Sequence, residues 1–272
     1  MSRIRQVTEK ANRSGSKLLI PYLVAGDPNI GTTVAVMHSL VEKGADIIEL
    51  GIPFSDPASD GPIIQRAVER SLNKSTSLSD TLDIGAEFRK SNDFTPIVLM
   101  GYLNPIEIMG YDLFVEKAEE AGIDGVLIVD MPPAESADLH YRLQLVGIDT
   151  IFLIAPTTKE LRAKSIVKVT TGYLYYVSLK GVTGAALSDY KSVKEKVSAL
   201  RNITTLPIVI GFGIKDGESA KMMAEISDGV VIGSALVEKI GSLNDAEIVQ
   251  QEIEEVTDLI KAIRYSIDSL NL

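Results

Sequence analysis

The chain has 272 residues, of which 45% are hydrophobic, and this is enough to bury one large core. We therefore expect a single domain over residues 1–272. The formal charge of −10 argues against nucleic acid as a partner, because phosphates would be repelled and no basic stripe reverses the sign locally. The absence of cysteine excludes disulfides, thiolate nucleophiles and cysteine-based metal sites.

The first segment, residues 1–17, carries five basic residues among polar ones and has no continuous apolar core. It predicts an amphipathic helix and not a secretory signal. The longest largely apolar runs, such as 206–214, reach about nine residues, whereas a membrane-spanning helix needs roughly twenty. These features predict a soluble, cytoplasmic protein.

Short runs of apolar and β-branched residues recur along the chain and predict eight buried strands. The stretches between them, such as 112–121, 134–146 and 191–200, have helical spacing. This alternation favours a parallel sheet closed into a single (β/α)8 TIM barrel with an extra N-terminal helix, and an open doubly wound sheet is the alternative. The predicted strands are residues 18–25, 45–52, 96–102, 125–130, 150–155, 173–179, 206–211 and 229–232.

The second predicted strand contains the most informative residue. Glu49 lies inside the apolar run 45–50, where an unpaired charge is rarely buried. The alternative is a glutamate that reaches the strand rim or pairs with a buried cation, but the nearest basic residue, Lys43, precedes the strand. Asp60 follows in the proline-rich loop 53–62. Two carboxylates thus flank the carboxyl end of a strand, where barrel enzymes place catalytic groups.

Other polar residues end further strands. Tyr102 and Asn104 end the third strand and Tyr175 lies within the sixth. Asp130 ends the fourth strand, directly before Met131 and two prolines, and we interpret it as a residue that fixes a turn or caps a helix.

Glycine turns follow the last two strands, at 211–214 and 233–235. In this fold these two loops most often build a phosphate site. Glycine lets backbone amides approach phosphate oxygens, because no Cβ stands in the way. A third glycine segment, 181–184, could close over the same place as a lid.

The segments 49–62, 101–102, 181–184, 211–214 and 233–234 together resemble the tryptophan synthase α subunit family along nearly the whole chain. The resemblance implies a (β/α)8 barrel that cleaves indole-3-glycerol phosphate to indole and D-glyceraldehyde 3-phosphate without a cofactor. It also implies a partner, because the family passes indole to a pyridoxal-phosphate β subunit for tryptophan synthesis in an α2β2 assembly.

By this resemblance Glu49 and Asp60 are the catalytic carboxylates, and Thr183 is the lid residue that engages Asp60. The phosphate would be held by backbone amides, and the indole by an apolar pocket. The residues expected to bind substrate are Tyr22, Met100, Tyr102, Leu127, Tyr175, Thr183, Gly184, Phe212, Gly213, Ile232, Gly233 and Ser234, of which Gly184, Gly213, Gly233 and Ser234 would hold the phosphate. The surface expected to meet the β subunit includes Pro53, Asp56, Asn104 and Pro132.

The implied reaction is a retro-aldol cleavage, in which indole leaves only after its C3 atom is protonated. One carboxylic acid can supply that proton and then accept the proton of the glyceryl hydroxyl, which suits Glu49. A second carboxylate, Asp60, can stabilise the charge that develops at the indole N–H. Burial should raise the pKa of Glu49, because desolvation disfavours the charged form.

The same sequence can be tested against the residues that other functions require. A zinc-dependent aldolase needs imidazole or thiolate ligands, but His38 and His140 both fall in predicted helices, away from strand ends. A Schiff-base aldolase could use only Lys180, beside the lid glycines. A stand-alone indole-releasing lyase and a purely allosteric partner subunit are the remaining alternatives, and the two carboxylates argue against the latter.

Overall fold

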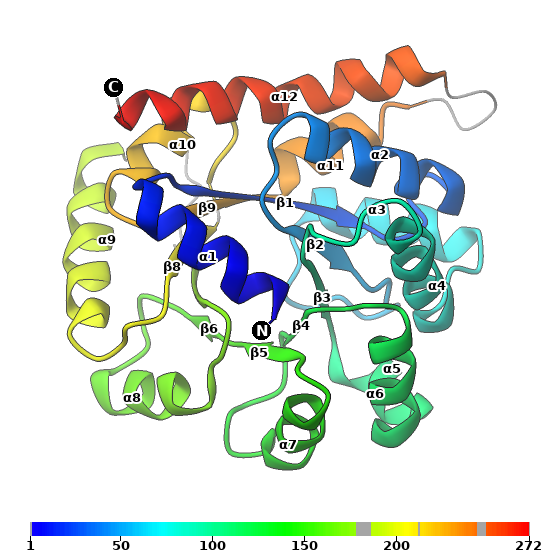
Figure 1. Cartoon of the computed structure of the whole chain (residues 1–272), viewed down its shortest axis with the longest axis horizontal. Coiled ribbons are helices and arrows are strands. Elements are labelled where there is room, and N and C mark those ends of the chain that lie inside the picture. Colours follow the sequence, from blue (N-terminus) through cyan, green and yellow to red (C-terminus); the bar gives the residue numbers. More distant parts are fainter. Residues whose placement is uncertain (1, 178–185, 212, 244–248, 272) are drawn as a thin grey trace.

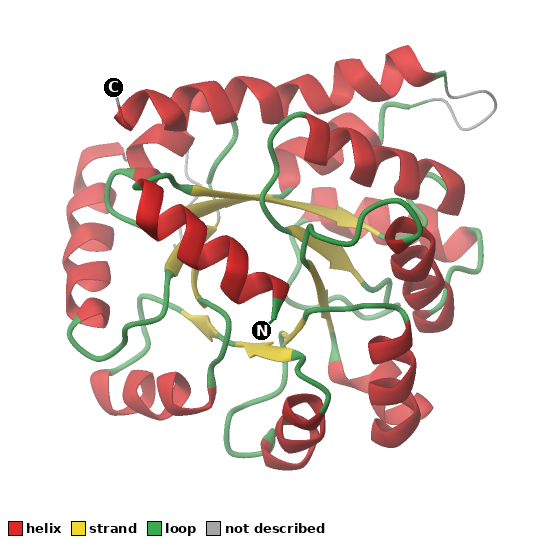
Figure 2. Ribbon diagram, in the orientation of Figure 1, coloured by secondary structure: helices red, strands yellow, loops and turns green. Residues whose placement is uncertain are grey.

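The computed structural model describes residues 2–177, 186–211, 213–243 and 249–271. Its strands form one parallel sheet in the order β5-β4-β3-β2-β1-β9-β8-β7-β6, surrounded by helices (Figures 1 and 2). The order follows the chain without the reversal of a doubly wound sheet. The two end strands, β5 and β6, are consecutive in the chain, so the sheet curls into a barrel. The (β/α)8 prediction is confirmed and the open-sheet alternative is wrong.

The strands are short and almost entirely buried, as in parallel sheets that helices cover. They are β1 Leu18–Val24, β2 Ile48–Gly51, β3 Ile97–Gly101, β4 Gly125–Ile128, β5 Asp149–Ile151, β6 Leu153–Ile154, β7 Leu174–Val177, β8 Ile208–Gly211 and β9 Gly229–Ile232.

The helices include the predicted N-terminal helix and those expected near 112–121, 134–146 and 191–200. They are α1 Arg3–Ser14, α2 Ile30–Glu42, α3 Pro62–Asn73, α4 Leu78–Arg89, α5 Leu103–Met109, α6 Tyr111–Glu120, α7 Ala137–Leu145, α8 Glu160–Val169, α9 Ala186–Arg201, α10 Gly217–Ala224, α11 Ser234–Ile240 and α12 Gln250–Asp268, with a final 3-10 turn, Ser269–Asn271. None of the helices in the described ranges combines the length and apolarity that crossing a membrane would take.

The predicted fifth strand differs from the structure, which divides it at Phe152 into β5 and β6. Among the described strands, β5 pairs with β4 and β6 pairs with β7, and Thr171 N, just before β7, donates to the Thr150 carbonyl of β5 at 2.8 Å. The change of partner interrupts the ladder, although the Phe152 carbonyl still accepts a hydrogen bond from Tyr175 N at 3.3 Å. Phe152 packs into the outer core around α8 and α9. The peptide chain at Phe152, between β5 and β6, therefore completes the barrel.

Two apolar layers follow from the alternation of side chains along each strand. The inner layer fills the barrel with residues such as Ile20, Val98 and Val209. The outer layer, with residues such as Leu19 and Leu99, lies between the strands and the helices.

Helix α1 lies across one end of the barrel (Figure 1). Its Ile4 is fully buried with Leu18 and Tyr173, at the starts of two strands, so α1 covers the amino end. The opposite end, where the strands finish, carries the loops that hold Asp60 and the glycine turns.

Candidate active site

A narrow cleft opens at the carboxyl end of the barrel. Its free volume is about 10 Å³, roughly the space of one water molecule. It is lined by the predicted site residues Tyr22, Asp60, Met100 and Tyr102, and by Ile52, Phe54, Pro57, Val68, Gly101 and Val129, which were not predicted as site residues.

Glu49 on β2 lies beneath this cleft, in register with Tyr22 on β1. Its side chain is 0% exposed. Burial raises its pKa to about 7, and a hydrogen bond from Tyr173 partly opposes the rise. Its full burial rules out a glutamate that reaches the strand rim, and no cation pairs with it in the described part of the chain. Glu49 is therefore a carboxyl group that can hold or release a proton near neutral pH.

Tyr173 is a site residue that the sequence analysis missed. Its hydroxyl donates to Glu49 Oε1 at 2.7 Å, and both side chains are buried. Glu49 Oε2 has no hydrogen-bond partner among the described residues. One oxygen is thus held while the other is left bare. The strand alternation that turns Tyr175 inward also turns Tyr173 inward, and this was the available signal.

Asp60 lies in the loop after β2 and is half-buried. Tyr102 donates to Asp60 Oδ2 at 3.0 Å and accepts from Ser59 N at 3.0 Å. Burial raises the pKa of Asp60, and the hydrogen bond from Tyr102 opposes this. The Tyr102 ring also contacts Phe54, with centroids 5.4 Å apart. Tyr102 therefore holds Asp60 and its loop in place.

Tyr22 interacts electrostatically with both carboxylates. Its pKa is raised well above the ordinary value, first by burial and then by the charges of Asp60 and Glu49. Its hydroxyl occupies the space that a side chain at Gly51 would fill. Both carboxylates consequently influence one buried group beside the cleft, the Tyr22 hydroxyl.

The residues predicted to hold indole do not all face inward. Leu127 and Tyr175 lie in the inner layer and Met100 packs against it. Ile232 packs in the outer layer, in register with Pro21, and its place in the indole pocket stays a prediction. The neighbouring Val231 takes the inward position. Successive side chains of a strand point to opposite faces, so Val231 and Ile232 do not both face the barrel interior.

The predicted phosphate site is described only in part. Gly213 is exposed and has φ +78°, a conformation that favours glycine, and Gly233 precedes Ser234 at the start of α11. Thr183, Gly184, Phe212 and Lys180 lie outside the described residues.

The expected partner surface is mostly accessible. Asp56 and Asn104 are exposed and Pro132 is half-buried. Pro53 is buried, so it does not lie on the surface where we expected it, because the loop after β2 folds back over the strand end. Asp130 caps α5 by accepting from Leu103 N at 2.8 Å.

The two histidines lie on helices, as predicted, and contact neighbouring side chains there. His38 on α2 stacks on Phe88, and His140 on α7 contacts Thr150. Within the described ranges, no group of three or more histidine, aspartate or glutamate residues could hold a metal ion.

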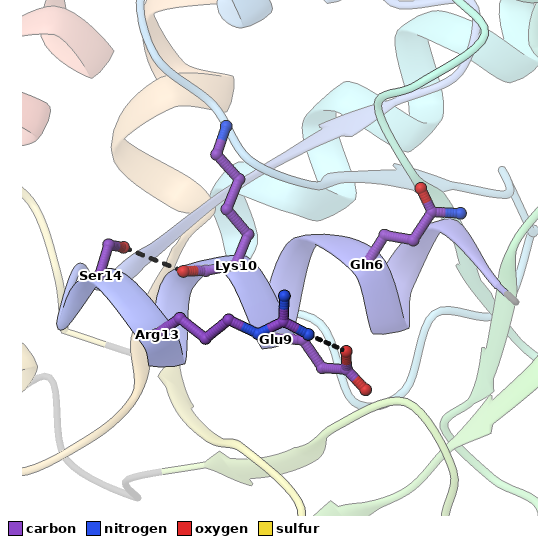
Figure 3. Close-up of a pocket in the computed structure, with 5 residues that line it drawn as sticks. All are labelled: Gln6, Glu9, Lys10, Arg13 and Ser14. Atoms are coloured by element: carbon purple, nitrogen blue, oxygen red, sulfur yellow. Dashed lines mark hydrogen bonds and ion pairs between the residues drawn. The ribbon is translucent and has the colours of Figure 1, made fainter.

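A second hollow, of about 470 Å³, lies on the outer surface of α1, at the amino end of the barrel (Figure 3). It is open, and three of its side chains have partners within it: Arg13 pairs with Glu9, and Ser14 bonds to the Lys10 carbonyl. Its position away from the carboxylates excludes it from their chemistry.

A parallel (β/α)8 barrel that gathers two carboxylates at the carboxyl ends of its strands defines an enzyme of the general acid–base class. The chain belongs to the tryptophan synthase alpha chain family, whose model matches residues 8–264.

Individual relatives agree with this membership. A tryptophan synthase alpha chain from Methylococcus capsulatus is 49% identical over 269 residues, which cover 99% of this chain and 100% of the relative. The crystal structure of tryptophan synthase subunit alpha from Legionella pneumophila has a TM-score of 0.91 and 42% identity, covering 99% of each chain. A chain of the tryptophan synthase complex from Pyrococcus furiosus has a TM-score of 0.81 and 36% identity, covering 91% of this chain and 98% of that one.

Proposed function

We propose that this chain cleaves indole-3-glycerol phosphate to indole and D-glyceraldehyde 3-phosphate, as the alpha subunit of a tryptophan synthase. The observation that carries the proposal is Glu49, a fully buried carboxyl group whose pKa is raised to about 7 and which pairs with no cation among the described residues. Such a group is protonated often enough at neutral pH to act as an acid and is still able to act as a base.

Glu49 performs both proton transfers. Its acid form protonates indole C3, which turns the ring into a leaving group. The carboxylate then takes the proton of the adjacent glyceryl hydroxyl, the carbon–carbon bond breaks, and indole and an aldehyde result. The bare Oε2 is the oxygen available for these transfers, because Tyr173 occupies Oε1.

Asp60 supplies the negative charge that the protonated indole requires at its N–H. Tyr102 supports this role because its hydroxyl fixes one Asp60 oxygen and leaves the other for the substrate. The backbone amides of Gly213, Gly233 and Ser234, with Gly184, bind the phosphate. Phosphate binding far from the reacting bond contributes to positioning, which proton transfer alone does not supply.

The cleft is too small for an indole ring in the conformation described. Substrate binding therefore moves side chains of the rim, and the loop that carries Phe54 and Asp60 is the segment that must shift. The same loop also carries the exposed Asp56, so a β subunit that contacts this loop affects the position of Asp60 without a distant relay.

The partner in this proposal is a tryptophan synthase β subunit in an α2β2 assembly, which receives the indole. The proposed contact surface comprises Asp56, Asn104 and Pro132 at the mouth of the barrel, with Pro53 beneath them. The proposal takes residues 1–272 as one domain and places the protein in the cytoplasm.

The test is to incubate the purified chain with indole-3-glycerol phosphate, with and without a β subunit, and to measure indole and glyceraldehyde 3-phosphate. We expect both products in equal amounts and a higher rate with the partner. Asp56→Ala should keep basal cleavage and lose part of the activation. No cleavage under either condition would contradict the proposal, and full rate without any activation would favour a stand-alone lyase.

A further inference from the structure

One buried carboxylate takes no part in the proposed chemistry. Asp27 follows β1 and is only 1% exposed. Arg70 on α3 grips both of its oxygens, with Nε to Oδ1 at 2.7 Å and Nη2 to Oδ2 at 2.8 Å. Burial raises the pKa of Asp27 and the guanidinium opposes this. A forked pair of this kind fixes direction as well as distance.

The same end of α3 is anchored again on the turn after β1. Ser71 Oγ donates to the Ala25 carbonyl at 2.6 Å, in a buried position. Gly26 has φ +78°, and a side chain there would collide with Thr76, just beyond the helix. The last turn of α3 is therefore fixed on the carboxyl end of β1.

The other end of α3 carries the catalytic loop. Gly61 caps the helix directly after Asp60, and Pro62 is its first residue. Gln65, in the next turn, donates to the Asp60 carbonyl at 2.8 Å. The position of α3 consequently sets the position of the Asp60 backbone.

Apolar packing alone does not fix this helix in its register. The face of α3 formed by Ile64, Ala67 and Val68 packs on β1 and on Val237 of α11. Such packing is not directional, so it defines the register of the helix less sharply than a forked ion pair does. Arg70 also fills the space beside Gly241, at the end of α11, where a side chain would collide with its guanidinium.

We propose that the Asp27–Arg70 ion pair is a positioning pair that holds α3 in the register at which Asp60 meets the indole N–H. The inference rests on the proposed function, because it takes Asp60 to be catalytic. Neither residue of the pair touches substrate.

The test is Arg70→Lys, which keeps the charge and loses the fork. We expect kcat to fall about 10-fold to 100-fold, as for a small misplacement of a catalytic group, with KM changed less than about threefold. Rates are measured well below the unfolding temperature of the variant. Arg66→Lys, at an exposed position of the same helix, is the matched control and should leave both constants unchanged.

If Arg70→Lys does not fold, Gly241→Ala tests the positioning role of the pair instead. It retains both charges and displaces the guanidinium, and a loss of kcat is again expected. The inference is overturned if the folded variants have a lower Tm but wild-type kcat, which is the signature of a purely structural ion pair. Asp60→Asn is assayed alongside: if it retains turnover the proposed function fails, whereas an inactive Asp60→Asn with a normal Arg70→Lys refutes only the positioning role.

Discussion

Two buried carboxylates at opposite ends of the barrel have opposite surroundings. At the amino end, Asp124 is 4% exposed and accepts from Arg3 at 2.9 Å, Arg89 at 2.5 Å and Ile97 N at 2.9 Å. At the carboxyl end, Glu49 is more deeply buried and, among the described residues, accepts one hydrogen bond, from Tyr173. The chain can clearly satisfy a buried carboxylate where stability requires it. The sparse environment of Glu49 is thus best explained by its chemistry.

The largest expected effect is loss of turnover in Glu49→Gln. The amide keeps the shape of the side chain but transfers no proton, so we expect kcat to fall by about 10³-fold or more. Binding of a non-reactive substrate analogue should change less than about threefold. Single-turnover kinetics and calorimetric titration measure the two quantities, and near-wild-type turnover would remove Glu49 from the mechanism.

Asp124→Asn should show the reverse pattern, a loss of stability without loss of catalysis. Two arginines lose their countercharge, and breaking a buried ion pair costs about 3–5 kcal/mol in free energy of unfolding. Urea unfolding measures the loss, and kcat is assayed where the variant is folded. Asp112→Asn, which breaks an exposed pair with Arg142, is the control and should cost less than about 1 kcal/mol. Equal costs in the two variants would contradict the comparison.

The burial of Glu49 should also make stability depend on pH. Its carboxyl pKa is about 7 in the folded chain and 4.5 in the reference state, so the folded state binds more protons between these values. The free energy of unfolding therefore falls as pH rises through this window, by about 3 kcal/mol at about 1.4 kcal/mol per pH unit. Glu49→Gln lacks this contribution. Urea unfolding of both proteins at pH 4 and pH 8 should show the difference, and identical pH dependence would exclude it.

The smallest expected effect is a shift of the pH profile of turnover in Tyr173→Phe. Tyr173→Phe removes the hydrogen bond that lowers the pKa of Glu49, so that pKa should rise above its value of about 7. Turnover that needs the acid form should then persist to correspondingly higher pH. Tyr176→Phe, on the same strand but packed in the outer layer, should leave the pH profile unchanged. A profile that does not move in Tyr173→Phe would mean that the hydrogen bond has no influence on the acid.

The sequence predicted most of the fold because strands and helices alternate with clear apolar patterns. Glu49 and Asp60 could be found because a charge within an apolar strand and a second one in the next loop conflict with simple burial. Tyr173 could not be paired with Glu49, since 124 residues separate them. Val231 and Ile232 could not be told apart, because a strand that is apolar on both faces carries no alternation. The break at Phe152 depends on pairing partners that no local pattern specifies.

The junction at Phe152 divides the barrel into two arcs of hydrogen-bonded strands, β1 to β5 and β6 to β9. Across the described residues, the only ladder between the arcs is that of β1 with β9. Two backbone hydrogen bonds that cross this junction run from Thr171 N to the Thr150 carbonyl at 2.8 Å and from Tyr175 N to the Phe152 carbonyl at 3.3 Å, whereas β1 and β9 are joined over four register pairs. Local unfolding at the junction should therefore cost less than separation of β1 from β9. Amide hydrogens on the two sides of the seam should exchange with solvent earlier than those of β1, and the molecule should open as a hinged shell.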